Sequence, residues 1–315
     1  MSKKITIIGA GFVGSTAAYA LLAKHVADEI SLIDINEKLV NSQVMDLQHS
    51  VPFFGLCKIK AGTYDDIKNS QVVVMAAGVS QKPGQTRFDL VKQNARIIRD
   101  ITPKIFSKNP KVILLMVTNP VDILTYLACS LFPQKEKQII GSGTVLDSAR
   151  FRFLLGEYFK INPQSIHAYI VGEHGDSEVP LLSTATIGNM PITRFKNYSK
   201  KAILKIFEKA KNAAYSIIEG KQATYYAIGA GIAQICQAIL HNENRVLPLS
   251  HLIHNQCGIS DVALSLPTVL GDKGIVQELI FDICPEEMEK LKESAAMLKK
   301  VIKKNNIIYA NIVKI

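Results

Sequence analysis

The 315-residue chain contains no tryptophan, and aromatic residues make up only 7% of it. It also lacks long apolar runs, because no stretch approaches the roughly 18 apolar residues that a membrane-spanning helix needs. The start "MSKK" has the positive charge of a secretory signal, but the apolar segment after it is too short and leads directly into a glycine motif. We therefore expect a soluble, cytoplasmic protein with no membrane partner.

Cysteine is scarce, with five residues at irregular spacing. No two of them have the short spacing of a zinc knuckle or a redox motif, and an odd number favours reduced thiols in a cytosolic protein. His251 and His254 form no better metal site, because residues three apart in a strand face opposite sides and no carboxylate or cysteine adjoins them. We expect no metal.

Concentrated charge is lacking too, although the net charge is +10. Lysine and arginine are scattered, and the one lysine-rich segment, "LKKVIKKNN" at 298–306, has no interleaved aromatic residues. A solvated helix face explains that segment better than a nucleic-acid site does. We expect no nucleic-acid partner.

The first half of the chain alternates between short apolar runs and stretches with helical spacing. Such alternation predicts an α/β fold, a Rossmann-type doubly wound parallel sheet whose strands are buried on both faces. The expected strands are "KITIIGA", "EISLIDI", "QVVVMAAG", "KVILLMVTNP" and "QIIGSGT". We expect this domain to span residues 1–142 and to bind a dinucleotide.

The pattern changes after residue 142. We expect a helix over 146–159, a strand over 165–175, long helices within 200–240 and a terminal helix from Pro285. The segments "RVLPLSHLIH" and "VALSLPTVLG" indicate antiparallel strands. Residues 143–315 are therefore predicted to form a closely packed α+β substrate domain.

"GAGFVG" has the G-x-G-x-x-G spacing, directly after the first strand and at the start of a helix. In that context Gly9 permits a tight turn, Gly11 lets a pyrophosphate approach, and Gly14 allows close packing of helix on strand. Asp34, 20 residues beyond Gly14, can accept a hydrogen bond from a ribose hydroxyl and would repel a 2′-phosphate. These features favour NAD over NADP.

"GEHGDS" places His174 between glycines just beyond an apolar segment. A carboxylate that could orient the imidazole is offered by Asp147, three residues before Arg150 on a predicted helix. The two residues could form only a helix ion pair. Alternatively, Asp147 pairs with the imidazole and Arg150 binds a substrate carboxylate, and the spacing leaves both readings open.

The loop "GVSQKPGQTR" follows the strand at 71–78 and is too polar for a core. At the carboxyl end of a parallel strand such a loop hangs over the ligand crevice. Its composition is typical of a lid that closes over a bound substrate.

Taken together, the chain resembles the L-lactate/malate dehydrogenase family, most closely the bacterial L-lactate type. The matching segments occur in family order: "GAGFVG", "LIDI", "MDLQHS", "AAGVSQKPGQTRFDL", "VTNPVDILTY", "GSGTVLDSARFR", "GEHGDSEVP" and "ATYYAIG". The resemblance implies an NAD-dependent enzyme that transfers hydride between NADH and pyruvate to give L-lactate, as part of fermentative glycolysis.

The resemblance also implies roles for individual residues. His174 matches the acid/base, Asp147 its orienting carboxylate, and Arg87 the loop cation that polarises the carbonyl. Substrate would be bound by Gln81, Arg87, Asn119, Arg150 and Thr224. The cofactor would be bound by Gly9, Gly11, Phe12, Val13, Gly14, Asp34, Gly78, Asn119, Ser142 and Ile228.

Gln81 lies where malate dehydrogenases carry an arginine for the second carboxylate of oxaloacetate. An uncompensated carboxylate in a closed site is costly, so an uncharged Gln81 favours pyruvate. The sequence departs from the family at Gln222, where many relatives have glycine two residues before the pocket threonine. We expect a perturbed loop there but the same role for Thr224.

The resemblance further implies a homotetramer. Arg152 and His167 match positions that bind fructose 1,6-bisphosphate in allosteric bacterial relatives, and two cations suit a phosphate. These two residues could equally hold only a subunit contact.

Two alternatives remain beside the L-lactate reading. One is a dehydrogenase of malate or another 2-hydroxy acid. The other is an NAD(H)-sensing binding protein, which would explain the glycines and Asp34 but not Arg87, Asp147, Arg150 and His174 together.

Overall fold

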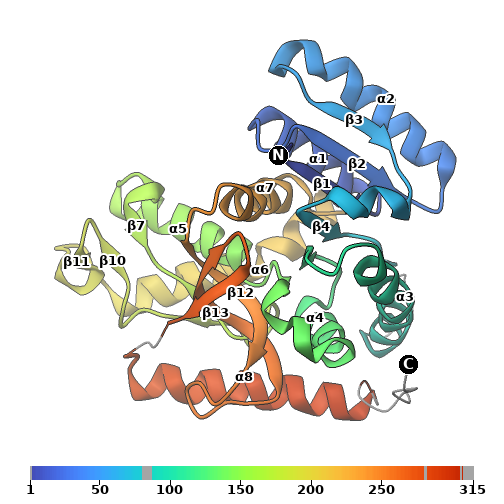
Figure 1. Cartoon of the computed structure of the whole chain (residues 1–315). Helices are drawn as coiled ribbons and strands as arrows, with labels where there is room; N and C mark the ends of the chain where they lie inside the picture. The colour runs from blue at the N-terminus through green and yellow to red at the C-terminus, as the bar shows by residue number, and fades with distance from the viewer. Residues whose placement is uncertain (1, 80–86, 280–281, 306, 308–315) are drawn as a thin grey trace.

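The computed structural model describes residues 2–79, 87–279, 282–305 and 307, with residues 87–89 described by their backbone alone. In this part of the chain, one sheet runs through the molecule in the strand order β14-β13-β12-β6-β5-β4-β1-β2-β3 (Figure 1). Six of its strands are parallel. They are β1 (Lys4–Ile8), β2 (Glu29–Ile33), β3 (Lys58–Ala61), β4 (Val72–Met75), β5 (Ile113–Met116) and β6 (Ile139–Gly141). The predicted parallel sheet is confirmed.

Both faces of this sheet are buried, as its continuous apolar strands predict. Alternate residues of β4 enter two separate cores, Val73 and Met75 on one face and Val72 and Val74 on the other. The first face is covered by α3 (Arg87–Lys108) and α4 (Val121–Leu131), and the second by α1 (Phe12–Ala23), α2 (Glu37–Phe54) and α7 (Tyr226–Leu240).

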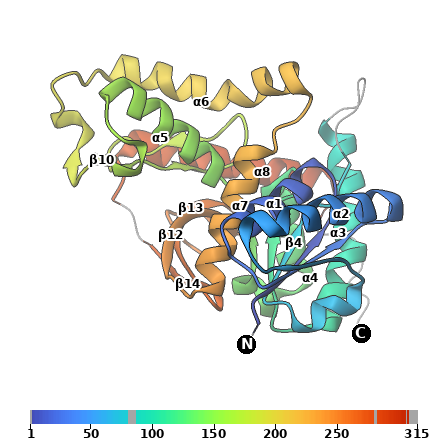
Figure 2. The ribbon, with the colours of Figure 1, turned by 90° about the horizontal axis from the view of Figure 1, so that it is seen from above.

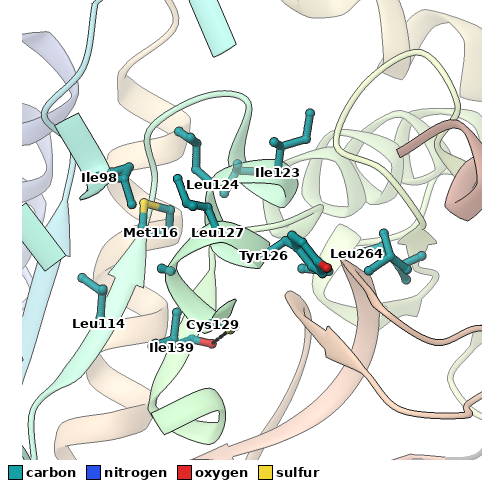
Figure 3. Close-up of a cluster of buried hydrophobic side chains, with 14 of the residues drawn as sticks. Ile98, Leu114, Met116, Ile123, Leu124, Tyr126, Leu127, Cys129, Ile139 and Leu264 are labelled. Atoms are coloured by element: carbon teal, nitrogen blue, oxygen red, sulfur yellow. Dashed lines mark hydrogen bonds between the residues drawn. The ribbon is translucent and has the colours of Figure 1, made fainter. Parts of the chain in front are cut away.

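The core on the α4 side is almost entirely aliphatic (Figure 3). Leu124 and Leu127 of α4 and Met116 of β5 are at most 1% exposed. Figure 3 shows them directed toward one another, with Cys129 beside Ile139. At roughly 25 cal/mol per Å² of buried apolar surface, contacts of this kind hold α4 rigidly against the sheet, and α4 begins at the candidate site.

The two predicted antiparallel strands are confirmed as β12 (Arg245–Ile253) and β13 (Val262–Gly271), and β14 (Gly274–Glu278) follows them. They continue the same sheet, because Ser250 of β12 pairs with Gly141 of β6. The sheet thus runs on past the boundary expected at residue 142.

Outside this sheet lie α5 (Val145–Phe159), α6 (Lys200–Lys221) and α8 (Pro285–Lys304). Figure 2 shows α5 and α6 together on the side of β10, with α2 and α3 on the opposite side. As expected, α8 begins at Pro285, with Glu286 and Glu287 in its first turn.

The prediction of a single strand over 165–175 was wrong. The chain changes sheets within it: β7 (Ile166–His167) pairs with β10 (Thr186–Ile187), whereas β8 (Ile170–Val171) pairs with β9 (Val179–Pro180). Gly172 then ends the extended run at φ +86°. Its turn brings the next residues over the parallel sheet. The remaining short strand is β11 (Met190–Pro191), which pairs with β10.

Candidate active site

The imidazole of His174 is held by a carboxylate from another element. Oδ2 of Asp147 lies 2.5 Å from Nδ1 of His174, and Oδ1 of Asp147 lies 3.0 Å from Nη1 of Arg150. Asp147 and Arg150 are one helical turn apart on α5, so both lie on its face toward the loop that carries His174. The structure therefore combines the two readings that the sequence left open: Asp147 binds the arginine of its own helix and the imidazole at once.

The charges of this cluster support one another. Asp147 raises the pKa of His174 to about 9 by stabilising the imidazolium, which outweighs the opposing effect of burial. Burial raises the pKa of Asp147, but His174 and Arg150 outweigh it, so that its pKa is lowered overall. A carboxylate can only accept hydrogen bonds, so Nδ1 of His174 carries a hydrogen. The other ring nitrogen, Nε2, is left to exchange a proton with a substrate.

The backbone beneath His174 is fixed by two further side chains. The N–H of His174 donates to Oδ2 of Asp122 at 2.7 Å, and the N–H of Glu173 donates to Oγ of Ser294 at 2.9 Å. Asp122 lies in the first turn of α4 and is 2% exposed, and burial raises its pKa to about 6. The loop is thereby tied to α4 and α8, which limits movement of the imidazole.

Two adjoining cavities meet at this cluster. One, of about 400 Å³, is lined by Asn119, Asp147, Arg150, His174 and Glu178, among others. The second, of about 180 Å³, shares Asn119, Arg150 and His174 with the first. It adds four residues expected from the resemblance: Val13, Ser142, Thr224 and Ile228. Six of the predicted cofactor and substrate residues therefore line these two cavities together with His174.

The glycine turn between β1 and α1 has the geometry that a dinucleotide requires. Gly9 has φ +105°, and a Cβ at Gly14 would lie 1.8 Å from the carbonyl oxygen of Gly9, so helix and strand pack too closely for any side chain. A Cβ at Gly11 would meet nothing within 4 Å. The space beside Gly11 at the start of α1 is thus open, where unpaired N–H groups and the helix dipole favour a pyrophosphate.

Asp34 lies just beyond β2, beside this turn. Its Oδ2 accepts from the N–H of Ala10 at 2.7 Å and its Oδ1 from the N–H of Asn36 at 2.9 Å. Asp34 therefore orders the glycine turn, and the carboxylate is at the position that meets an adenosine ribose in dinucleotide folds. Phe12, the first residue of α1, is exposed and stacks on Tyr225 with 5.3 Å between the ring centroids.

Asn94 joins the loop after β4 to the loop after β5. Its Oδ1 accepts from the N–H of Val79 at 2.9 Å, and its Nδ2 donates to the carbonyl oxygen of Asn119 at 2.7 Å. Gly78 leaves no room for a side chain, because a Cβ there would lie 2.4 Å from Cγ2 of Thr118. Asn94 was not predicted, although it is a polar residue among the apolar positions of α3 and is only 1% exposed.

The backbone at Gln222 keeps a conformation that favours glycine, the residue that many relatives have at this position before the pocket threonine. Gln222 follows α6 with φ +70°, and its N–H donates to the carbonyl oxygen of Ile218. This left-handed helix end is the conformation for which glycine is favoured. The glutamine adopts it, and Thr224 still lines the smaller cavity.

Other predicted residues lie apart or outside the described side chains. Arg152 of α5 is partly buried, and its Nε donates to the carbonyl oxygen of Ser148 at 3.3 Å. His167 of β7 is exposed. Gln81 and the side chain of Arg87 lie outside the described residues.

The structure also describes the two weaker histidine candidates. His251 is 1% exposed, whereas His254 is exposed and pairs with Glu136 at 2.9 Å. Among the described residues, no group of three or more His, Cys, Asp and Glu is arranged to hold a metal ion. Nor does any helix in the described ranges have the length and apolar character needed to cross a membrane.

The glycine turn that suits a dinucleotide lies beside a guanidinium and an imidazole bound to a carboxylate. This arrangement suits hydride transfer, because the cofactor supplies the hydride while the protein supplies a proton and a positive charge. Fold and site thus define a nicotinamide-dependent dehydrogenase. Residues 3–141 match the lactate/malate dehydrogenase NAD binding domain, and residues 144–307 match the lactate/malate dehydrogenase alpha/beta C-terminal domain. The chain belongs to the lactate/malate dehydrogenase family, and its cofactor is NAD.

Individual relatives agree with this assignment. The chain is 46% identical over 306 residues to an L-lactate dehydrogenase of Acetivibrio thermocellus, covering 96% of each chain. It is 44% identical to an L-lactate dehydrogenase of Thermus aquaticus, covering 94% of this chain and 97% of that one. The crystal structure of a minor L-lactate dehydrogenase from Enterococcus mundtii, in a ligand-bound form, matches with a TM-score of 0.93 at 37% identity, covering 96% of this chain and 98% of that chain.

Proposed function

We propose that the protein is an L-lactate dehydrogenase, which reversibly reduces pyruvate to L-lactate with NADH. The observation that carries this proposal is the Asp147 carboxylate, bound to the imidazole of His174 on one side and to Arg150 on the other, in a cavity shared with the cofactor-side residues. NADH supplies the hydride. The residues of the chain supply orientation, one proton and charge stabilisation.

In the direction of pyruvate reduction, the planar guanidinium of Arg150 binds the substrate carboxylate through two parallel hydrogen bonds. This places the 2-oxo group beside His174. Protonated His174 donates the proton on Nε2 to the carbonyl oxygen as the alcohol forms, and Asp147 keeps the ring oriented throughout. In the reverse direction, neutral His174 accepts the hydroxyl proton.

The loop before α3 completes the proposed site. Arg87, which begins α3, is assigned to polarise the carbonyl, and Gln81 to select pyruvate by offering no cation to a second carboxylate. Both assignments rest on the resemblance and on charge, and neither side chain is described.

The test is NADH oxidation followed with pyruvate and then with oxaloacetate. Turnover that is faster with pyruvate is the expected result. Faster turnover with oxaloacetate would make the protein a malate dehydrogenase. NADH binding without turnover of either acid would favour a protein that only senses NAD(H).

We also propose that the enzyme is a homotetramer in the cytoplasm that fructose 1,6-bisphosphate activates through Arg152 and His167. Support comes from the family resemblance and from an arginine and a histidine on two elements that contact each other, α5 and β7. Activity at low pyruvate and the mass from analytical ultracentrifugation should both rise with the bisphosphate. The regulatory proposal fails if neither changes.

A further inference from the structure

Glu178 is a buried acid to which the proposed reaction gives no role. It lies between His174 and β9, and it is only 7% exposed. Its Oε1 has no hydrogen-bond partner among the described residues. A buried, unpartnered carboxyl group is costly, so its position beside an active site calls for a physical reason.

The carboxyl group lies in a wall shared by two cavities. It lines the cavity of about 400 Å³ with Asp147, Arg150 and His174. It also lines a cavity of about 350 Å³ between α6 and the start of α8. Glu178 thus shares a cavity with the catalytic cluster and does not line the smaller cavity that holds Thr224 and Ile228.

Most other charges around Glu178 already have partners. At the second cavity, Glu286 of α8 pairs with Lys200 at 3.0 Å and with Lys290 at 2.8 Å. Glu287 of α8 accepts from the N–H groups of Leu182 and Ser183.

On α6, Lys211 lies 3.6 Å from Glu208 and donates to the carbonyl oxygen of Asp176 at 3.3 Å. Beneath the histidine, Asp122 accepts from its backbone. The charges that act on Glu178 are, largest first, those of Asp147, the imidazole of His174, Lys211 and Arg150, so three of the four belong to the catalytic cluster.

Burial, followed by repulsion from Asp147, raises the pKa of Glu178 to about 8. The pKa of His174 is raised to about 9. Glu178 is therefore neutral near pH 7, and it becomes negative in the range where the imidazole is still protonated. The negative charge that Glu178 acquires in this pH range opposes loss of the proton from the imidazole of His174.

We propose that Glu178 is a positioning residue, because its charge in the wall of the substrate cavity stabilises the protonated imidazole of His174. This inference rests on the proposed function, in which protonated His174 donates a proton to pyruvate. It extends toward alkaline pH the range over which the enzyme can reduce pyruvate. Glu178 itself touches no reacting atom.

The test is the pH profile of kcat/KM for pyruvate in Glu178→Gln and wild type, because that ratio reports the pKa values of the free enzyme. The loss of kcat/KM in the variant should be smaller near pH 7 than at pH 9, since glutamine resembles the neutral acid. The midpoint of the alkaline decline should fall by roughly half a pH unit or more. The matched control is Glu286→Gln, which removes a carboxylate from the second cavity alone and should leave the midpoint unchanged.

A second readout does not depend on turnover. Diethylpyrocarbonate modifies the neutral form of an imidazole and not the protonated form. The rate of modification at His174, located by tandem mass spectrometry and separated from modification at the exposed His167, therefore reports the protonation of this imidazole against pH. This midpoint should shift in the same direction in Glu178→Gln even if pyruvate proves to be the wrong substrate.

Equal midpoints in Glu178→Gln and wild type, in both assays, would overturn the proposal. A lower melting temperature without a shifted midpoint would likewise leave Glu178 with a purely structural role and overturn it. If Glu178→Gln does not fold, Glu178→Asp withdraws the carboxyl group by one methylene. It should lower the midpoint by less, and an unchanged midpoint there would also contradict the proposal.

Discussion

The pairing of Asp147 with His174 makes a quantitative prediction about Asp147→Asn. Asp147 is the largest cause of the rise in the pKa of His174 from 6.5 to about 9. This difference of 2.5 units corresponds to about 3 kcal/mol of interaction with the imidazolium. If the variant imidazole returns to about 6.5, its protonated fraction at pH 8 falls from roughly nine-tenths to about 3%.

The pH dependence should change in both directions of the reaction. Reduction of pyruvate needs the protonated ring, so its kcat/KM at pH 8 should fall by about 30-fold or more. Oxidation of lactate needs the neutral ring, so the pH midpoint of its kcat/KM should fall with the pKa of the imidazole. The assay is NADH appearance and disappearance over pH 6–10, with Asp100→Asn as a control, since Asp100 is exposed and forms an ion pair with Lys104. An unchanged pH midpoint in either direction would refute the reasoning.

Four further substitutions test separate parts of the account. His174→Asn should leave NADH affinity, measured by fluorescence, within about twofold and lower turnover by 10²-fold or more. Gly14→Ala puts a Cβ 1.8 Å from the carbonyl oxygen of Gly9 and should lower both NADH affinity and the free energy of unfolding, the latter by roughly 1–3 kcal/mol in urea titration. Gln222→Gly relieves the left-handed backbone at φ +70° and should raise the free energy of unfolding by about 0.5 kcal/mol. Gln81→Arg should shift the ratio of kcat/KM values toward oxaloacetate.

Each of these has a contradicting result. Loss of folding in His174→Asn would give the imidazole a structural role. NADH affinity unchanged in Gly14→Ala would remove the glycine turn from the cofactor site. A less stable Gln222→Gly would show that the glutamine side chain matters more than its backbone strain. An unmoved substrate ratio in Gln81→Arg would remove Gln81 as the selector.

The parallel sheet could be predicted because its central strands are largely apolar, with β4 and β5 apolar at every position, which indicates burial on both faces. Two elements of the same half were missed for a local reason. β3 is the short edge strand "KIKA", with no apolar run, and α2 has only Val40, Val44 and Leu47 buried along 18 residues. Whether such an edge or surface segment forms a strand or a helix depends on tertiary contacts that its own sequence pattern does not reveal.

The candidate site was predictable where its residues carry a motif, as in "GAGFVG" and "GEHGDS". The distance between Asp147 and His174 was not predictable, since it depends on the broken extended segment at β7 and β8 and on the turn at Gly172. Asn94 and Glu178 were not predicted, because what distinguishes them is that their polar side chains are buried, and burial is seen only in the structure. A polar residue inside an apolar helical pattern is the one signal that could have identified Asn94.

The most direct test of the central claim is the product of the reaction with NADH and pyruvate. Chiral chromatography of the reaction mixture should find L-lactate in an amount equal to the NADH consumed, and Asp147→Asn and His174→Asn should slow its formation. NADH consumed without L-lactate, or no consumption by a folded protein that binds NADH, would contradict the account.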